Sequence, residues 1–591
     1  MSIRIFDIET DGYDPTRIHV LVIKDVDTNE VHRFRQNGRE NSIPLGLQML
    51  ADSDVIVGHN IIKYDLWAIR KLYPNWKTRA KAFDTIACTY LIWTNIKDID
   101  IAKANRGEFP KDCIKKHHLK AWGYRLGIFK GEFIGPWEKW TQEMEDYCVQ
   151  DVEVTHALYL KIVEKNYSQA AFDLEHEVYP LIAEQERNGF MFDRAAAVEL
   201  YATLVKKRLE LEAKLKEHFE WWFMPGASFT PKKDNAKKGY VAGATMTKLK
   251  IVEFNPRSRD HIADRLMKLR GWRPTSFTDG GKPEVNEEII AARPYPEAPL
   301  IGEMLMIEKR IGQLAEGDHA LLKHYNEQDC RIHGGVLING TVSGRAAHIA
   351  PNLAQVPQPR SPYGKEFRAL FIAPEGMVLV DADASGLELR MLAHYLAKYD
   401  GGEYVKVILD GDVHTHNQHM AGLDTRDQAK TMIYCMIYGG GDEKLGSITG
   451  KGANAGRKLR NRFLENVPAY AKLSEGVKSV ARARKYLIGL DGRHLMVRSL
   501  HSALNLLLQS AGAIIMKKAM KLYHEDLWRQ GIKFKQVCWI HDEYIVECRP
   551  EDAQKVGKAM VNAIKQAGEL FNLRCPLAGE YHVGKNWGEV H

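Results

Sequence analysis

The stretch from residue 377 to residue 439 constrains the fold more than any other part of the chain. It opens with the apolar run Met-Val-Leu-Val, which predicts a buried strand leading into Asp381 and Asp383. Both carboxylates face the same side of that strand, so periodicity alone does not decide which of them could hold a metal ion. A carboxylate at a strand end is reachable by a metal from solvent, although an aspartate there is often only a turn residue.

Two cations and two phenol rings follow at every fourth position. They are Arg426, Lys430, Tyr434 and Tyr438. On a helix this spacing places the four side chains on one slowly drifting stripe. Such a stripe, facing a strand-end carboxylate, suits a metal-bound polyphosphate, with rings to stack on a base. The alternative is a helix face that is merely solvated.

These segments resemble the polymerase motifs of family A DNA polymerases. The resemblance is carried by Asp383-Ala-Ser-Gly-Leu-Glu388-Leu-Arg, by Arg426-x3-Lys430-x3-Tyr434-x3-Tyr438-Gly439, and by His541-Asp542-Glu543. It is strongest for the replicative polymerases of short-tailed bacteriophages, and it covers nearly the whole chain.

The resemblance implies an α/β exonuclease domain with an RNase H-like fold, joined to an α+β right-hand polymerase with an antiparallel palm sheet and a helical thumb and fingers. The expected boundaries are 1–165 for the exonuclease, 166–330 for the linker and thumb, 331–398 for the first part of the palm, 399–510 for the fingers, and 511–591 for the second part of the palm and the tail. A chain of 591 residues is too long for a single core, which agrees with several domains.

Composition excludes other classes of protein. The balance of 83 basic and 76 acidic residues, a net charge of +7, permits a polyanionic partner without demonstrating one. The eight cysteines include no Cys-x-x-Cys pair, so neither a zinc ribbon nor a disulfide framework is predicted. The chain has no secretory signal and no apolar run of membrane-spanning length. We therefore expect a cytoplasmic protein, in the host cell if the chain is encoded by a phage.

Four carboxylates in the first part of the chain could meet in space. Asp7 and Glu9 alternate in a predicted strand and face the same side. A second strand is predicted from Asp54, running into a loop at His59 and Asn60, and Asp65 lies at the start of the helix that follows. Tyr147 and Asp151 are four residues apart and share a helix face. Clustered carboxylates repel one another unless divalent cations neutralise them, and two such cations can hydrolyse phosphodiesters. Each piece alone is weak, because Asp-x-Glu pairs on surface strands are common and usually inert.

Taken in order, these pieces resemble the three motifs of DnaQ-like 3′–5′ proofreading exonucleases. The resemblance implies that Asp7, Glu9, Asp65 and Asp151 bind two Mg²⁺ ions, or Mn²⁺ in their place, and that Tyr147 orients the attacking water. A decayed structural domain is the alternative.

For the polymerase, the resemblance selects Asp383 over Asp381 as a metal ligand, with Asp542 as the second. Residues 537–547 predict a hairpin that brings Asp542 to the edge of the sheet, and two Mg²⁺ ions are implied there also. Glu543 is expected to be auxiliary, and His541 to brace the primer end.

The resemblance also assigns the substrate contacts. Arg426, Lys430 and His414 are expected to bind the triphosphate, while Arg345, Asn505 and Gln509 contact the primer–template. Tyr438 closes the nucleotide pocket, and Glu388 acts as a steric gate against ribonucleotides. The phenol of Tyr434 implies poor discrimination against dideoxynucleotides.

Residues 155–216 predict helices, for which a helical hairpin with solvated charged faces is a sufficient explanation, and the resemblance implies that this region is part of the thumb. A basic loop is expected at about 221–250. That loop stands where some phage polymerases bind thioredoxin, and a plain DNA contact fits equally well. The other expected partners are primer–template DNA, deoxynucleoside triphosphates, a helicase-primase and a single-strand binding protein. A repair polymerase, an RNA-synthesising relative, and a catalytically silent replisome scaffold are the alternative functions. A role for His591 is left open.

Overall fold

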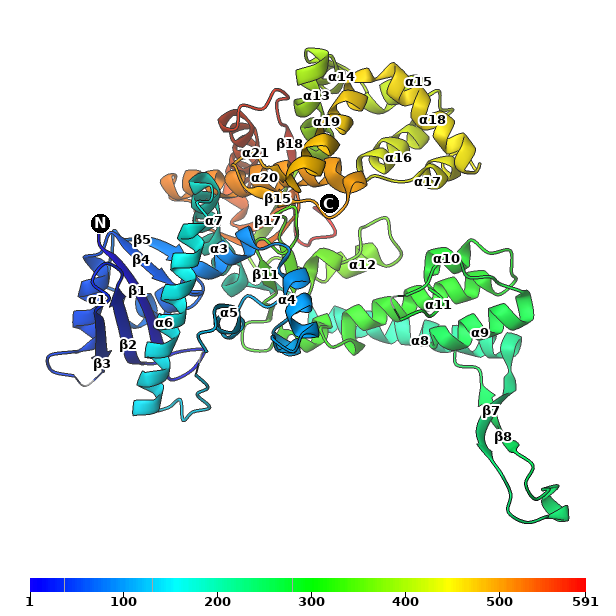
Figure 1. The fold of residues 1–591 in the computed structure, drawn as a ribbon. Coiled ribbons are helices and arrows are strands. Elements are labelled where there is room, and N and C mark those ends of the chain that lie inside the picture. Colours follow the sequence, from blue (N-terminus) through cyan, green and yellow to red (C-terminus); the bar gives the residue numbers. More distant parts are fainter. Residues whose placement is uncertain (37, 130, 279, 591) are drawn as a thin grey trace. The chain divides into compact units, whose positions relative to one another are not determined.

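In the computed structural model, residues 1–36, 38–129, 131–278 and 280–590 are described. The chain forms two compact units. The first comprises Met1–Phe190, His333–Gln355 and Ala373–His591, and the second comprises Met191–Ile332 and Val356–Ile372. Both units take segments from separate parts of the sequence (Figure 1). His591, whose role the sequence leaves open, lies outside the described residues.

The first part of unit 1 is an α/β structure around a five-stranded sheet. Its strands are β1 (Ile3–Thr10), β2 (Ile18–Asp25), β3 (Val31–Arg35), β4 (Val55–Gly58) and β5 (Lys81–Asp84), in the order β3-β2-β1-β4-β5. β1 is antiparallel to β2 and parallel to β4, so the sheet is mixed. The strands predicted around Asp7 and before Asp65 are therefore present, and they are neighbours in the sheet.

This part of the chain also contains the helices α1 (Ile43–Ala51), α2 (Asp65–Leu72), α3 (Thr85–Ile92), α4 (Ile96–Asn105), α5 (Leu119–Leu126) and α6 (Gln142–Glu164). Helix α1 packs on β2 and β3, whereas α3 and α5 pack on α6. The long helix α6 lies along β1 and β2 (Figure 1). Its apolar residues Met144, Cys148 and Val152 recur every fourth position and pack against Ile5 and Val20. This packing fixes the rotation of α6, and with it the direction of Tyr147 and Asp151.

A second sheet in unit 1 is antiparallel throughout. Its strands are β13 (Val378–Ala384), β16 (Phe534–Ile540), β17 (Glu543–Cys548) and β18 (Gly579–Gly584), in the order β16-β17-β13-β18. β16 and β17 form the hairpin predicted from the sequence, with His541 at a φ of 56° in its turn. Helices α20 (Ala503–Arg529) and α21 (Ala553–Leu570) pack on each other, and α21 packs on β13 and β18. The expected antiparallel sheet is confirmed.

The region between β13 and α20 is mainly helical. It contains α13 (Leu387–Asp400), α14 (Glu403–Asp410), α15 (Val413–Ala421), α16 (Arg426–Ile437), α17 (Asp442–Ser447), α18 (Ala453–Asn466), α19 (Pro468–Arg484) and the small hairpin of β14 (Tyr486–Ile488) and β15 (His494–Met496). A capping box between Thr425 and Gln428 starts α16 one residue before Arg426. The helix predicted from the four-residue spacing is therefore present, and Arg426 lies in its first turn. Helix α7 (Gln169–Asn188) follows α6 and ends before Gly189.

Unit 2 consists mainly of helices and carries a projecting two-stranded hairpin. The helices are α8 (Arg194–Phe219), α9 (Arg259–Arg270), α10 (Glu287–Ala291), α11 (Ala298–Ile311) and α12 (Gly364–Ala369), and α8 packs on α11. The loop expected at about 221–250 is instead a two-stranded antiparallel hairpin of β7 (Trp221–Phe229) and β8 (Met246–Glu253). The register pairs Phe223 with Ile251, and Trp221 and Leu249 lie on the same face of the hairpin as this pair. The expectation of a loop gave too much weight to the lysines and glycines between the two strands.

All eight cysteines are free thiols, of which Cys330 is partly exposed and the other seven are buried. Buried thiols of this kind pack as small apolar groups. None of the helices among the described residues combines the length and apolarity needed to cross a membrane.

Candidate active sites

The first candidate site lies where β1 and α6 meet. Asp7 and Glu9 on β1 and Cys148 on α6 each place one possible ligand atom within 4.8 Å of the others. The thiol of Cys148 lies 3.6 Å from Oδ2 of Asp7. Burial raises the pKa of Cys148 well above its ordinary value, and the nearby carboxylates add to this rise. The sulfur therefore remains a protonated donor to Asp7, which leaves metal binding to the carboxylates.

Asp65 joins this group from the start of α2. The backbone N–H of Ile8 donates to Oδ1 of Asp65 at 3.3 Å, which holds the first turn of α2 against β1. Burial raises the pKa of Asp65 to about 7, and the neighbouring carboxylates of Asp84 and Asp151 add to the rise. The structure thus brings Asp65 and Asp151 close to the pair on β1, as their positions in the sequence predict.

Tyr147 lies one helical turn before Asp151 on α6. Its ring packs among aromatic neighbours, with ring centroids 5.9 Å from Phe133 and 6.5 Å from Trp137. These contacts hold the ring beside the carboxylate group without burying it fully.

Sequence reasoning missed Asp84, which shapes the approach to this site. Asp84 is fully buried at the end of β5 and accepts hydrogen bonds from the backbone N–H groups of Asn60, Ile62 and Ile86 at 2.9 to 3.0 Å. Burial raises its pKa to about 6. The bonds to Asn60 and Ile62 fix the turn between β4 and α2, and therefore the position of Asp65. Its place directly before the helix at Thr85 is an N-cap signal that could have found it.

The carboxylate group fits divalent cations. The raised pKa of Asp65 shows that negative charge is unfavourable at this point of the structure. Hard cations such as Mg²⁺ prefer carboxylate oxygens and would remove that penalty.

The second candidate site lies at the end of the antiparallel sheet. Asp383 on β13 is directly opposite Glu543 on β17. The N–H of Ala384 donates to the backbone oxygen of Asp542 at 3.1 Å, so the turn of the β16–β17 hairpin is held beside Asp383. Burial raises the pKa of Asp542, which again fits a site for a cation.

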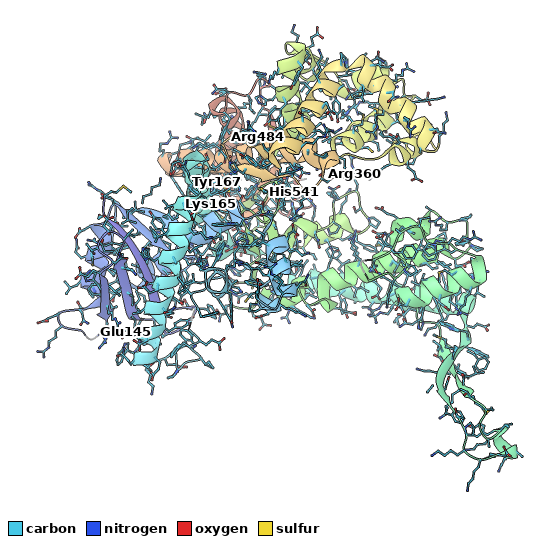
Figure 2. The ribbon with its side chains drawn as sticks, viewed as in Figure 1. Glu145, Lys165, Tyr167, Arg360, Arg484 and His541 are labelled. Carbon is cyan, nitrogen blue, oxygen red and sulfur yellow. The ribbon has the colours of Figure 1, made fainter. Side chains whose placement is uncertain are left out.

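The residues on either side of Asp542 are held differently. Glu543 is 5% exposed and accepts a hydrogen bond from the indole of Trp587 at 2.7 Å. This bond fixes the C-terminal tail against the site. His541 is exposed in the turn (Figure 2), and its backbone oxygen accepts from the indole of Trp539 at 3.1 Å.

Glu388 joins three separate segments of the chain. It lies in the first turn of α13 and accepts from Nη2 of Arg345 at 2.9 Å. Its other oxygen accepts from the hydroxyl of Tyr438, at the end of α16, at 2.7 Å. Arg345 and Glu388 also lie close enough to influence the pKa of Asp542. The predicted gate residue is therefore bonded to Arg345, which is expected to contact the primer–template, and lies close to a predicted metal ligand.

The stripe on α16 faces α15. Arg426 makes an ion pair with Asp412, with Nε 2.6 Å from Oδ2. Asp412 is the N-cap of α15, two residues before His414, and the guanidinium holds the pKa of its carboxyl well below its usual range. The rings of His414 and Tyr434 have centroids 6.5 Å apart. The structure therefore brings the predicted phosphate-binding groups of α15 and α16 together, with Arg426 already paired.

Tyr434 and Tyr438 stack with ring centroids 6.3 Å apart. The residue after them, Gly439, packs on the short turn that precedes α20, because a Cβ there would lie 2.3 Å from the backbone oxygen of His501. Asn505 and Gln509 lie in the first turns of α20, and both are half-buried. The buried amide oxygen of Asn505 has no hydrogen-bond partner among the residues that the structure describes.

Comparison with known proteins gives three findings. The model of "DNA polymerase family A" matches residues 233–589. The chain is 39% identical to a DNA-directed DNA polymerase of Enterobacteria phage T3, over 98% of each chain. It is also 39% identical to a DNA-directed DNA polymerase of Escherichia phage T7, over 99% of this chain and 100% of that relative. The POL domain of Pol1 from M. smegmatis, solved in complex with DNA primer-template and dNTP, is similar in fold with a TM-score of 0.74 at 16% identity, over 99% of this chain and 96% of that one.

Proposed function

This chain belongs to DNA polymerase family A, and from that membership we propose how its two groups of carboxylates act on DNA. The chain is a template-directed DNA polymerase of the kind found in bacteriophages. We propose further that it proofreads its product with a 3′–5′ exonuclease in the same chain. The observation that carries the polymerase site is the backbone bond from Ala384 to Asp542, because it brings Asp542 beside Asp383.

At the polymerase site, Asp383 and Asp542 would hold two Mg²⁺ ions, with Glu543 as an auxiliary carboxylate. Cations bound here would activate the primer 3′-hydroxyl and neutralise the negative charge of the triphosphate. The chain's own part is positioning, because phosphoryl transfer needs little covalent chemistry from a protein. The hydrogen bond from Trp587 holds Glu543 in one orientation at this site.

The helix α16 would bind the incoming nucleotide. Arg426 and Lys430 are exposed in its first half, where they can reach the β- and γ-phosphates, and His414 lies beside them. Arg426 would exchange the carboxylate of Asp412 for phosphate oxygens, which offer the same bidentate geometry. The ring of Tyr434 is half-buried between this cationic end and Tyr438 and would stack on the base or sugar.

Glu388 would exclude ribonucleotides. Its carboxylate is fixed by Arg345 on one oxygen and Tyr438 on the other, so it cannot turn aside for a 2′-hydroxyl. Arg345 would in turn reach the minor groove of the terminal base pair, where correct pairs present acceptors at fixed positions. Asn505, Gln509 and His541 would contact the primer–template near the same pair.

For the exonuclease, we propose that residues 1–165 form an RNase H-like domain. The support is the mixed sheet with β1 at its centre and the four carboxylates beside it. Asp7, Glu9, Asp65 and Asp151 would hold two divalent cations, and Tyr147 would orient the attacking water. The other predicted divisions, namely thumb, palm and fingers, are proposed with the boundaries given above.

The hairpin of β7 and β8 is proposed as the contact for a further replication partner. Trp221, Phe223, Leu249 and Ile251 are all at least half exposed and lie on one face of the hairpin. An exposed apolar face of this kind favours a protein partner, such as a thioredoxin-type processivity factor, over DNA alone. The lysines between the strands suit the DNA backbone. A helicase-primase and a single-strand binding protein would complete the machinery, in the cytoplasm of an infected cell.

Primer extension tests both sites together. The wild type, Asp542→Ala and Asp7→Ala are given paired or mismatched 3′ ends with Mg²⁺ and either deoxy- or ribonucleotides. We expect extension only with deoxynucleotides, loss of extension in Asp542→Ala, and loss of mismatch removal alone in Asp7→Ala. Binding of DNA without extension or trimming by the wild type would instead establish a silent scaffold, and the proposed metal sites would be wrong.

A further inference from the structure

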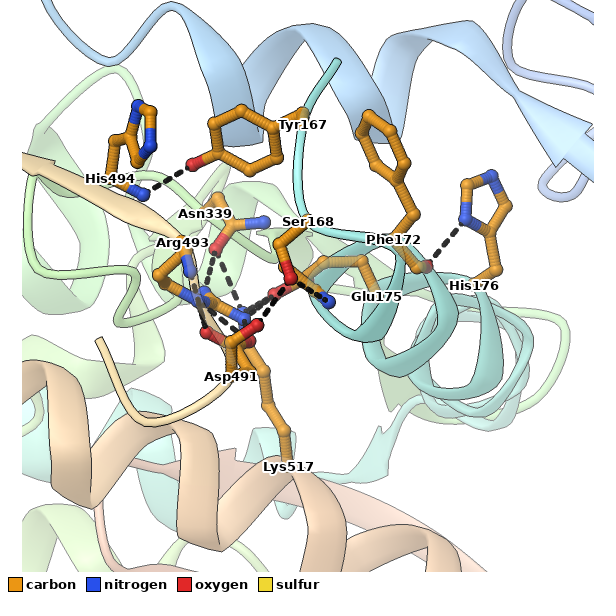
Figure 3. A network of polar contacts seen from close by, with 11 residues as sticks. Tyr167, Ser168, Phe172, Glu175, His176, Asn339, Asp491, Arg493, His494 and Lys517 are labelled. Atoms are coloured by element: carbon orange, nitrogen blue, oxygen red, sulfur yellow. Dashed lines mark hydrogen bonds and ion pairs between the residues drawn. The ribbon is translucent and has the colours of Figure 1, made fainter. Parts of the chain in front are cut away.

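Five polar residues, none of which belongs to either candidate site, form a buried network (Figure 3). They are Glu175 on α7, Asn339 in the segment 333–355, Asp491 and Arg493 in the turn of the β14–β15 hairpin, and Lys517 on α20. None of the five is more than 5% exposed. Charges removed from water in this way need partners with good geometry, so the contacts of each member decide what the network holds.

Arg493 is the centre of this buried network. Its Nη2 donates to Glu175 at 2.7 Å and to Asp491 at 2.6 Å, and its Nη1 donates to the amide oxygen of Asn339 at 3.2 Å. Lys517 donates to both oxygens of Glu175, at 2.7 and 2.9 Å, and to the same oxygen of Asn339 at 2.8 Å. Two cations and two carboxylates therefore balance, and Asn339 is the neutral acceptor that both cations share.

From Asn339 the network leads to Arg345. Two backbone hydrogen bonds close the turn at residues 341–345. The N–H of Gly344 donates to the backbone oxygen of Thr341 at 3.1 Å, and the N–H of Thr341 donates to the backbone oxygen of Arg345 at 3.3 Å. Gly344 packs directly on the network, because a Cβ there would lie 2.7 Å from Nη1 of Arg493, and its φ of +79° also favours glycine. The position of Arg345, and so of its bond to Glu388, follows from this contact.

In the other direction the network leads to the connector, residues 165–168 between α6 and α7. The hydroxyl of Tyr167 accepts from the backbone N–H of His494 at 2.7 Å (Figure 3). Ser168 donates to the backbone oxygen of Asp491. The hairpin that carries Arg493 is therefore fastened to the chain directly after α6, the helix that bears Asp151.

We propose that Arg493 and Lys517 are positioning residues that hold the turn at 341–345 against the connector, so that the reading of the terminal base pair by Arg345 depends on this buried network. The inference rests on the proposed polymerase site. It adds that the discrimination between paired and mispaired primer ends is set in part by residues that do not touch the DNA.

The test compares Lys517→Met and Arg493→Lys with a matched control. Lys517→Met keeps the length of the side chain and removes the charge, whereas Arg493→Lys keeps the charge and loses the forked contacts. The control is Arg125→Met, which breaks another buried pair of unit 1, between Arg125 and Asp100 at 2.8 Å. For each variant, kcat and KM for the next nucleotide are measured on paired and mispaired primers, together with trimming of a single-stranded oligonucleotide and Tm.

We expect the ratio of kcat/KM on paired primers to kcat/KM on mispaired primers to fall about threefold to thirtyfold in Lys517→Met and Arg493→Lys. This is the range for residues that couple two sites without touching a ligand. Trimming of the single strand should be unchanged, and Arg125→Met should lower Tm without changing the ratio. If the ratio stays constant, or if extension of both primers and trimming fall together in step with Tm, the network is only structural and the inference is wrong.

A double-mutant cycle with Arg345→Ala separates the inference from the proposed function. If the network acts through Arg345, Lys517→Met has no further effect on the ratio in the Arg345→Ala background. An undiminished effect there would overturn the positioning role even though Arg345 itself still reads the base pair. If Arg345→Ala alone leaves the ratio unchanged, the proposed role of Arg345 fails, which is a different result.

Discussion

The two candidate sites differ in how the negative charge around them is held. In the proposed exonuclease site, Glu9, Asp65 and Asp151 are between 4% and 7% exposed, and they come from β1, α2 and α6 of one α/β structure. Burial raises the pKa of Asp65, and repulsion from the neighbouring carboxylates adds to the rise. Around the proposed polymerase site, the carboxylates of Glu388 and Asp412 are instead each bonded to a cation that the substrate is expected to use.

The difference bears on how each site would respond to its ligand. At the proposed exonuclease site, a cation would relieve burial of charge and repulsion that are already present. At the proposed polymerase site, the nucleotide would instead compete with the carboxylate of Asp412 for Arg426, which favours a ligand with several matching phosphates over a single anion. Substitutions should therefore change stability at the first site and selectivity at the second.

The largest effect is expected from Asp65→Asn. Loss of a metal-binding charge should lower the rate of single-strand trimming by about 10³-fold, comparable with the loss of a strong electrostatic contact at other active sites. Because the substitution also removes repulsion, Tm in EDTA should rise, while the increase in Tm on adding Mg²⁺ should shrink. Extension of a paired primer is the control and should not change. A lower Tm in EDTA would contradict the account of this site as a repulsive cluster.

The same carboxylate predicts a pH dependence. The pKa of Asp65 in the folded chain, about 7, lies above its ordinary value of 3.8, so its contribution to stability is complete below pH 4 and is lost as pH rises through 7. In EDTA, the free energy of unfolding of the wild type should fall relative to Asp65→Asn between about pH 4 and 7. Chemical unfolding at several pH values measures this difference, and parallel curves for the two proteins would refute the shift.

At the polymerase site, Glu388→Ala should admit ribonucleotides. Removing the gate should lower discrimination against them by about tenfold to two-hundredfold, the range for a change in the shape of a pocket. Glu388→Gln is the matched control, because it keeps the volume while weakening the charged bond to Arg345. Discrimination is measured as the ratio of kcat/KM for deoxy- and ribonucleotides. If both variants admit ribonucleotides equally, charge rather than volume excludes them.

A smaller effect is expected from Tyr434→Phe. Loss of the phenol hydroxyl should raise discrimination against dideoxynucleotides by about tenfold, the value of one hydrogen bond in a half-buried site. The measurement is chain termination at fixed ratios of dideoxy- to deoxynucleotide. Equal inhibition of the wild type and the variant would exclude this role for Tyr434.

The smallest effect is expected from Asp412→Asn. Asparagine still accepts the N-cap hydrogen bonds that start α15, but it no longer pairs with Arg426. KM for the nucleotide should fall about twofold to fivefold, as for removal of one exposed ion pair, and kcat should not change. The difference should diminish at high salt. An unchanged KM at low salt would show that Arg426 is not the phosphate ligand.

Local patterns in the sequence predict much of this arrangement. The acidic start of α2, the four-residue spacing of α16 and the apolar strands around Asp542 each specify an element and the face it presents. These are short-range properties, because each depends on residues within one helix or one hairpin.

Contacts between distant segments could not be predicted in this way. The bond from Arg345 to Glu388 spans 43 positions and that from Tyr438 to Glu388 spans 50, and no periodicity relates such positions. Asp84 has a local signal for capping a helix, but its second role, holding the turn before Asp65, depends on the order of strands in the sheet. The buried network joins residues more than 300 positions apart for the same reason.

The hairpin of β7 and β8 makes the chain modular. Trp221 is paired with Glu253, and the N–H of Phe254 donates to the backbone oxygen of Glu220 at 2.9 Å, so the two ends of the hairpin meet. A segment whose ends are adjacent can be lengthened, shortened or exchanged with little change to the helices that carry it. This position in unit 2 can therefore acquire a new accessory module during evolution, or accept one by engineering, while α8 and α9 keep their fold.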